Sequence, residues 1–159
     1  YPNKVNSLVL CDTNLGSSRF SKEEKEEFVS LRAKPFEEGM RIEDFSPMIA
    51  KSLIGDFNNK NALSKLISSL NLLRKESYIK TVKTFISGDW LNNYSKIKVP
   101  CLVMVGELDN LTPPLVAEEI NALIPNSRLK IIKGAGHLIN IEKPRIFNEL
   151  ILKFLCQFS

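Results

Sequence analysis

Two side chains that could exchange a proton follow neighbouring apolar runs in the C-terminal part of the sequence. Asp109 comes shortly after residues 100–106, and the single histidine, His137, comes shortly after residues 129–132. A carboxylate on one ring nitrogen of a histidine fixes the tautomer and stabilises the imidazolium, so the other nitrogen can act as a general base. We therefore predict that Asp109 and His137 are catalytic.

The order of the two residues along the chain predicts a third catalytic residue upstream of both. An acid followed by a histidine, each after a strand, is how a Ser-Asp-His arrangement ends, with the serine upstream on a G-x-S-x-G turn. The 159 residues contain no such turn. Glu107 and Asp12 are backup candidates for the acid, and Glu142 is interpreted as a helix-start or salt-bridge residue.

Three short apolar runs, at residues 7–11, 100–106 and 129–132, are typical of strands buried on both faces of a parallel sheet. Loops after successive parallel strands meet at one edge, which brings Asp109 and His137 together. A helix is predicted between the second and third strands, with Thr112 as its N-cap and Pro113 as its first residue. A last helix begins near Pro144.

Residues 15–93 show helix after helix and no strand. Residues 21–24 form a capping-box pattern at the start of the first of these helices. Pro35 is expected to end or kink that helix, and Ser46-Pro47 to start a second one. The fold class is therefore α/β, with three parallel strands flanked by helices and an all-helical insert.

Composition and charge argue against nucleic-acid binding, a membrane span and a metal or cofactor site. The net charge of +4 comes from 22 basic and 18 acidic residues of interspersed sign, so we expect no nucleic-acid partner. No apolar run is long enough for a membrane span, and no metal or cofactor pattern is present. Cys11, Cys101 and Cys156 lie in apolar sequence and are expected to be buried free thiols, which favours a reducing, cytoplasmic location.

The C-terminal motifs resemble the α/β-hydrolase family. Residues 100–109 look like the seventh strand and triad acid of that family, and Gly136-His137 with Glu142 and Pro144 looks like its triad histidine and following helix. Residues 1–13 resemble the end of the nucleophile helix and the sixth strand. The resemblance covers the whole chain but not the first five strands, the oxyanion loop or the nucleophile turn of the family.

Finer details resemble one branch of that family. Asp12-Thr13, Glu38-Gly39-Met40 and residues 97–100 are similar to 3-oxoadipate enol-lactonases and related small esterases. The resemblance implies that residues 1–14 and 95–159 belong to the hydrolase core and residues 15–94 to its cap, or lid. It also implies hydrolysis of a carboxylic ester or enol-lactone by a serine that His137 activates and Asp109 supports.

Candidate pocket residues lie in the expected cap. Trp90, Tyr78 and Met40 could line an acyl pocket, although each residue type more often belongs to a core. Arg32 and Arg41 are candidates for contact with a carboxylate on the substrate. The expected partners are a small ester or lactone, the N-terminal half of the hydrolase fold, and a second copy of the chain through the apolar edge at residues 7–11.

Two other functions stay open. The chain could be a truncated, inactive hydrolase that serves as an interaction module. It could also be part of an epoxide or haloalkane hydrolase, in which an aspartate replaces the serine as nucleophile.

Overall fold

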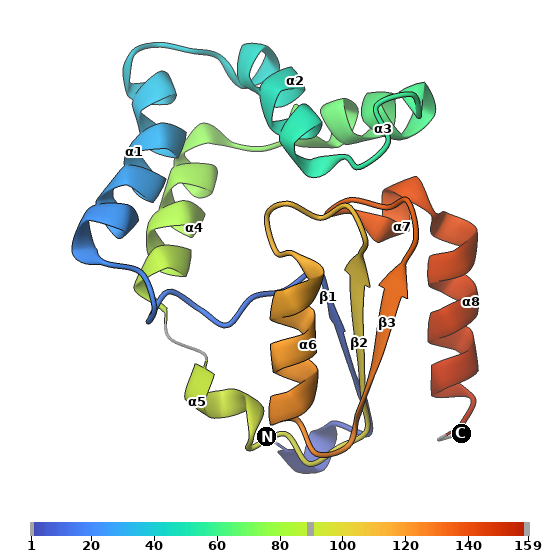
Figure 1. Ribbon diagram of the computed structural model, residues 1–159. Coiled ribbons are helices and arrows are strands. Elements are labelled where there is room, and N and C mark those ends of the chain that lie inside the picture. The colour runs from blue at the N-terminus through green and yellow to red at the C-terminus, as the bar shows by residue number, and fades with distance from the viewer. Residues whose placement is uncertain (1, 89–90, 158–159) are drawn as a thin grey trace.

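A sheet of three parallel strands lies at the centre of the computed structural model, which describes residues 2–88 and 91–157 (Figure 1). The strands stand side by side in sequence order and comprise β1 (Leu8–Cys11), β2 (Cys101–Gly106) and β3 (Ser127–Ile132). Parallel neighbours need long crossover connections, and helices supply both of them here. The predicted fold class is confirmed: three parallel strands flanked by helices, with a helical insert between the first two strands.

Helices make up most of the remaining described residues. Their bounds are η1 (Pro2–Lys4), α1 (Lys22–Glu37), α2 (Ile42–Leu53), α3 (Lys60–Leu70), α4 (Lys75–Ser87), α5 (Leu91–Tyr94), α6 (Pro114–Leu123), α7 (Ile139–Glu142) and α8 (Pro144–Leu155). Helices α1 to α5 lie in the connection from β1 to β2, α6 connects β2 to β3, and α7 and α8 follow β3.

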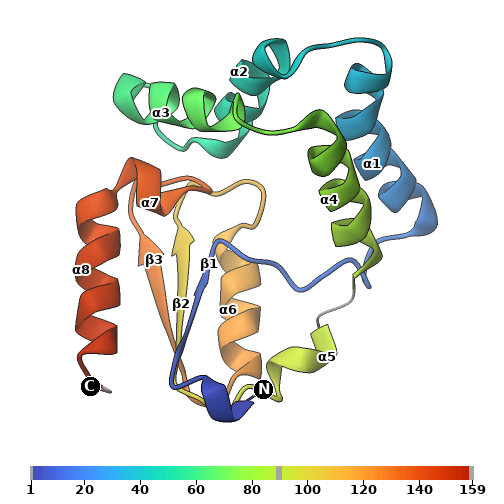
Figure 2. The ribbon, with the colours of Figure 1, turned by 180° about the vertical axis from the view of Figure 1, so that it is seen from behind.

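The central strand β2 is buried along its whole length and divides the core into two layers. Its side chains alternate between the faces of the sheet, as the strand period requires. Val103 and Val105 pack with Ile120 of α6 on one face. Leu102 and Met104 pack with Phe154 of α8 on the other face. Figures 1 and 2 show α6 and α8 flanking the sheet, so this layering holds the carboxyl edge of the sheet in place.

The helical insert has a small aromatic core of its own. Phe36, which is fully buried, meets the rings of Phe45 and Tyr78 edge-on, with centroids 4.6 and 5.7 Å away. These contacts connect α1, α2 and α4. Figure 1 shows α2 and α3 over the ends of the strands, next to α7. The insert therefore covers the edge of the sheet at which the predicted site lies.

The start of α1 agrees with the capping-box pattern in the sequence, whereas the start of α2 does not agree with the prediction made from Ser46-Pro47. The capping box is present: the Ser21 hydroxyl accepts the N–H of Glu24, and the Glu24 carboxylate accepts the N–H of Ser21. The prediction that Ser46-Pro47 starts the second helix was wrong, whereas α1 ends two residues after Pro35. Pro35 lies inside the last turn of α1, and Pro47 lies inside α2, which begins at Ile42. Burial of Phe45 and Ala50 stabilises α2 despite the missing donor of Pro47.

The start of α6, which flanks the sheet, also differs from the prediction. Pro113 is the N-cap of α6, and the helix begins at Pro114, so the prediction of Thr112 as the N-cap was wrong. A residue that precedes a proline disfavours the helical conformation, so Pro113 is extended (φ −62°, ψ 159°) and the helix begins at Pro114. The Thr112 side chain is thereby free for other contacts, described below.

The ends of the range 15–94 pack with the sheet. Leu15 and Tyr94 belong to the same hydrophobic cluster as Val103 and Ile120, and the Tyr94 hydroxyl donates to the carbonyl of Asn14. The division into a core of residues 1–14 and 95–159 and a cap of residues 15–94 stays a prediction. The structure shows that both junctions of this division are packed segments.

The three cysteines differ in burial. Cys101 is buried and Cys11 half-buried, whereas Cys156 is exposed just after the end of α8. The prediction that all three are buried was therefore wrong for Cys156. In the described parts of the chain, none of the helices combines the length and the hydropathy that a bilayer crossing would need.

Candidate functional site

Asp109 lies in the turn that follows β2 and is held there by its own side chain. Its Oδ1 accepts the backbone N–H groups of Leu111 and Thr112, both at 2.9 Å. Its backbone N–H donates to the carbonyl of Gly106. The side chain is fully buried. These bonds use one carboxylate oxygen for the turn and leave Oδ2 for other partners.

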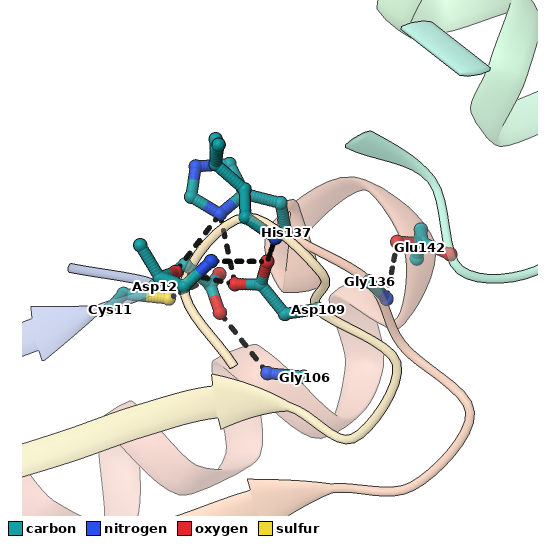
Figure 3. Close-up of polar contacts among 9 residues, drawn as sticks. Cys11, Asp12, Gly106, Asp109, Gly136, His137 and Glu142 are labelled. Atoms are coloured by element: carbon teal, nitrogen blue, oxygen red, sulfur yellow. Dashed lines mark hydrogen bonds and ion pairs between the residues drawn. The ribbon is translucent and has the colours of Figure 1, made fainter. Parts of the chain in front are cut away.

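His137 meets that second oxygen across the sheet edge, as Figure 3 shows. Its Nδ1 lies 2.9 Å from Asp109 Oδ2, and the ring keeps 19% of its surface exposed. The loop carrying His137 follows β3 as the loop carrying Asp109 follows β2, so both loops emerge at the carboxyl edge of the sheet. The two residues that the sequence singled out are in direct contact.

Thr112 is a third member of this group, which sequence reasoning missed. Its hydroxyl donates to Asp109 Oδ2 at 2.6 Å and lies 3.2 Å from His137 Nδ1. Because the threonine proton is used on Asp109, the neighbours of Nδ1 are both acceptors, and Nδ1 carries the hydrogen. Nε2 then has the free lone pair of a general base.

Burial and hydrogen bonding act in opposite directions on Asp109. Burial on its own raises the pKa of this carboxyl, but the hydrogen bonds from His137 and Thr112 outweigh burial, and the pKa lies below its ordinary 3.8. Asp109 is therefore a carboxylate at neutral pH. A negative charge held against Nδ1 stabilises the imidazolium that forms when Nε2 takes a proton.

The two backup acids lie beside the pair and have other partners. Asp12, at the end of β1, adopts φ of 47° and accepts the N–H of Gly106, and the Cys11 thiol donates to its second oxygen. Burial raises the pKa of Asp12 to about 6. Glu107 accepts the N–H of Gly134. In the described residues, Asp109 makes the hydrogen bond to the histidine ring.

A cavity of about 520 Å³ opens beside His137, between the sheet edge and the insert. Its wall on the insert side comes from Phe20, Phe28, Arg32 and Phe85, and its floor includes Asp12, Leu111 and Thr112. Aromatic and aliphatic side chains with a few polar groups are typical of a site for a small organic ligand. The ring of His137 is part of the cavity wall.

Arg32 is the charged side chain of that wall. Its guanidinium carbon lies 3.6 Å from the centre of the Phe28 ring, and Nη1 donates to the Phe28 carbonyl. Burial lowers the pKa of Arg32, and no carboxylate among residues 2–88 and 91–157 forms an ion pair with it. Arg41, the other arginine considered, is exposed and pairs with Asp44. The structure therefore brings Arg32 to the cavity and leaves Arg41 on the surface.

The three pocket candidates from the sequence lie elsewhere or are not placed. Tyr78 packs against Phe36 and Phe45 in the core of the insert. Met40 follows α1, and its backbone N–H donates to Pro35. Neither residue is part of the cavity wall at His137. Trp90 lies outside the described residues.

Metal ligation was also considered. Within the two described stretches, no three side chains of histidine, cysteine, aspartate or glutamate come together in a way that could hold a metal ion.

Comparison with known proteins gives a family match across most of the chain. A family model described as the alpha/beta hydrolase fold matches residues 1–144. The carboxylesterase YbfK of Bacillus subtilis is 39% identical over 61 residues, which are 38% of this chain and 21% of that protein.

Two solved structures share the fold. A thermophilic esterase from Thermogutta terrifontis superimposes on 99% of this chain with a TM-score of 0.86 and 24% identity. The enol-lactonase from Burkholderia xenovorans LB400 superimposes on 98% of it with a TM-score of 0.85 and 19% identity. In both cases the chain spans 58% of the other protein. These two likenesses show the fold.

Proposed function

The chain belongs to the α/β-hydrolase fold family, and on that premise we propose that it supplies the acid and the base of a carboxylic ester hydrolase. The observation that carries the proposal is the hydrogen bond between His137 Nδ1 and the buried carboxylate of Asp109, 2.9 Å long, at the wall of a cavity. Family membership alone does not fix an activity, whereas this geometry leaves Nε2 of His137 able to take a proton at the cavity.

The proposed reaction uses Nε2 of His137. A serine hydroxyl attacks the ester carbonyl, and its proton moves to Nε2, while Asp109 stabilises the imidazolium. The imidazolium then returns the proton to the departing alcohol, which leaves an acyl-serine. Water repeats the same two steps on the acyl group. Backbone N–H donors hold the oxyanion in each step.

The proposal assigns the serine and the oxyanion donors to a segment outside these 159 residues, which contain no G-x-S-x-G turn. Support comes from β1, which pairs with β2 on one side and with no other described strand. We propose that the N-terminal part of the fold, in the same polypeptide or as a second chain, pairs with that open edge.

The cavity supports a substrate class. Phe20, Phe28 and Phe85 offer apolar rings for an acyl chain or a lactone ring. Arg32 lacks a carboxylate partner in the described structure and could bind one on the substrate. Esters and enol-lactones that carry a carboxylate therefore fit the proposal best.

The test is a hydrolysis assay on the protein that joins these residues to the N-terminal part of the fold. Short p-nitrophenyl esters and enol-lactones are the substrates, and His137→Ala is compared with the exposed Lys22→Ala. The proposal predicts that His137→Ala lowers kcat by about 10³-fold or more and that Lys22→Ala has no effect. Hydrolysis that survives His137→Ala would overturn the assignment.

A further inference from the structure

Glu142, the last residue of α7, has a buried carboxylate that no basic side chain neutralises in the described structure. The sequence suggested a helix-start or salt-bridge role. Instead, Oε1 accepts the N–H of Gly136 at 2.7 Å, and Oε2 accepts the N–H groups of Gly55 and Asp56 at 2.9 and 3.1 Å. Figure 3 shows the first of these bonds. A buried charge is tolerated when hydrogen bonds satisfy it, as they do here.

The three donors come from two segments far apart in the sequence. Gly55 and Asp56 lie in the turn after α2, within the insert, whereas Gly136 directly precedes His137. The end of α2 reaches the histidine itself, because the backbone N–H of His137 donates to the carbonyl of Leu53, the last residue of α2, at 2.8 Å. Three hydrogen bonds thus leave the insert, one to the His137 loop directly and two to Glu142, and a fourth joins Glu142 to Gly136 of that loop.

Packing between the two segments leaves no space for side chains. A Cβ on Gly55 would lie 2.5 Å from the backbone nitrogen of Gly136, and a Cβ on Gly136 would collide with the nitrogen of Gly55. Backbones approach this closely only where both residues are glycine. The contact is therefore specific in shape as well as in hydrogen bonding.

A carboxylate suits this place better than its amide. All three partners are N–H donors, so both oxygens must accept. A glutamine has one acceptor oxygen, and its NH₂ group would face an N–H donor on at least one side. Substitution by glutamine thus removes part of the connection at nearly constant volume.

We propose that Glu142 is a positioning residue that joins the turn 53–56 of the insert to the His137 loop, so that the cavity wall and the base are placed together. The proposal rests on the proposed function of His137 as the base. It predicts that loss of the Glu142 bonds releases His137 from its fixed contact with Asp109, although Glu142 is not part of the cavity wall.

The experiment compares Glu142→Gln with Glu149→Gln in the full-length protein. Glu149 is an exposed residue of α8 that pairs with Arg145, which makes it a matched control. Three quantities are measured: amide hydrogen exchange, the downfield NMR signal of the His137 Nδ1 proton, and kcat and KM for a p-nitrophenyl ester. The NMR signal is assigned by its loss in His137→Gln.

In Glu142→Gln we expect the amides of Gly55, Asp56 and Gly136 to exchange at least tenfold faster, while those of β2 stay protected. The His137 Nδ1 proton signal broadens or disappears, and kcat falls about tenfold or more. Glu149→Gln matches the wild type in all three measurements. A sharp, unshifted Nδ1 signal and a kcat within twofold of the wild type, despite faster exchange at Gly55 and Gly136, would overturn the proposal.

A second variant tests the positioning role if the amides of β2 also exchange faster in Glu142→Gln. Gly55→Ala keeps the carboxylate and separates the same two segments, so it must give the same changes at His137, and an unchanged Nδ1 signal and kcat would contradict the proposal. Failure of the proposed function is recognised separately. In that case His137→Ala retains activity, while the exchange and NMR measurements on Glu142 still decide whether it positions His137.

Discussion

The hydrogen atom on Nδ1 of His137 determines what the site can do. Asp109 Oδ2 and the Thr112 hydroxyl oxygen both face that nitrogen as acceptors, which leaves Nε2 unprotonated on the other side of the ring. Oδ1 of the same aspartate is bonded to the backbone of its own turn. The position of the acid is thus fixed by hydrogen bonds within its own turn, which do not involve the histidine loop.

Asp109→Asn is expected to lower kcat by about 10⁴-fold, the size of effect that this change has in serine proteases. The amide oxygen can still hold the turn, but the NH₂ group then faces Nδ1 and Thr112, which favours the tautomer with hydrogen on Nε2. Ester hydrolysis by the full-length protein measures the effect, with the exposed Asp44→Asn as the control. A loss below tenfold would show that Asp109 does not orient the base.

Asp12 gives a prediction about pH and stability. Burial raises its pKa from 3.8 to about 6, so the folded state holds a proton that the unfolded state releases between these values. Stability therefore falls as pH rises from about 4 to about 6, and the penalty is complete above that. Asp12→Asn removes the penalty, and asparagine tolerates the positive φ of this position.

At pH 7.5 we expect Asp12→Asn to unfold with a free energy about 1 kcal/mol larger than the wild type, a value reduced for the solvent that reaches this half-buried group. At pH 3.5 the two proteins should be equally stable. Urea unfolding at both pH values tests this. An equal difference at both values, or a less stable variant at pH 7.5, would contradict the prediction.

At the scale of elements, the site depends on where the helices of the insert meet the sheet. Helix α1 brings Phe28 and Arg32 to the cavity, α4 brings Phe85, and the turn after α2 meets the His137 loop. The aromatic contacts of Phe36 hold α1, α2 and α4 together. One part of the insert thus forms the cavity wall, and another contacts the His137 loop and Glu142.

Arg32→Met is expected to raise the KM for anionic substrates and to leave the KM for neutral substrates unchanged. Charge-assisted hydrogen bonds contribute about 1.5–3 kcal/mol, which corresponds to a factor of ten or more in binding. The KM for a p-nitrophenyl ester that bears a carboxylate should therefore rise about tenfold, while that for p-nitrophenyl butyrate stays within twofold. The exposed Arg41→Met serves as the control. Equal losses for both substrates would exclude a carboxylate site at Arg32.

At the scale of the whole molecule, both outer strands of the described sheet pair on one side only, and β1 is the one whose residues are all half-buried. Strand β1 pairs only with β2 in the described structure, and its residues are half-buried and apolar. An unpaired apolar edge is a template for another strand. This edge is where the proposal places the N-terminal part of the fold.

Sedimentation of the 159-residue chain tests the consequence. We expect dimers or larger species when the chain is alone, and a one-to-one complex when the N-terminal part of the fold is added as a separate polypeptide. Lys4→Ala, which changes the charge beside the strand but not its apolar residues, should behave like the wild type. A monodisperse monomer that ignores the added polypeptide would contradict the proposed pairing.

The parts of the fold with local signals could be predicted from the sequence. The apolar runs marked the strands, and their order brought Asp109 next to His137. Thr112 was missed because a threonine before two prolines is typical of a helix cap. The signal that could have found it is the Asp-x-x-Thr spacing, in which the acid accepts the threonine N–H.

Other contacts depend on residues distant in the sequence. The partners of Glu142 lie in the turn after α2, and a glutamate beside a proline gives no sign of them. The cavity wall likewise combines α1 and α4 with the ends of the strands. Pro47 was misread because local propensity is weaker than the burial of the helix face around it.

In the proposed mechanism, His137, held by Asp109, activates a serine from outside these 159 residues. A fluorophosphonate forms a covalent adduct with a serine only when a base removes the hydroxyl proton as the oxygen attacks. Labelling of the protein together with the N-terminal part of the fold, read by peptide mass spectrometry, should give one adduct, on a serine of that N-terminal part, formed about 10³-fold more slowly in His137→Ala. An adduct within residues 1–159, or labelling that His137→Ala leaves unchanged, would contradict the claim.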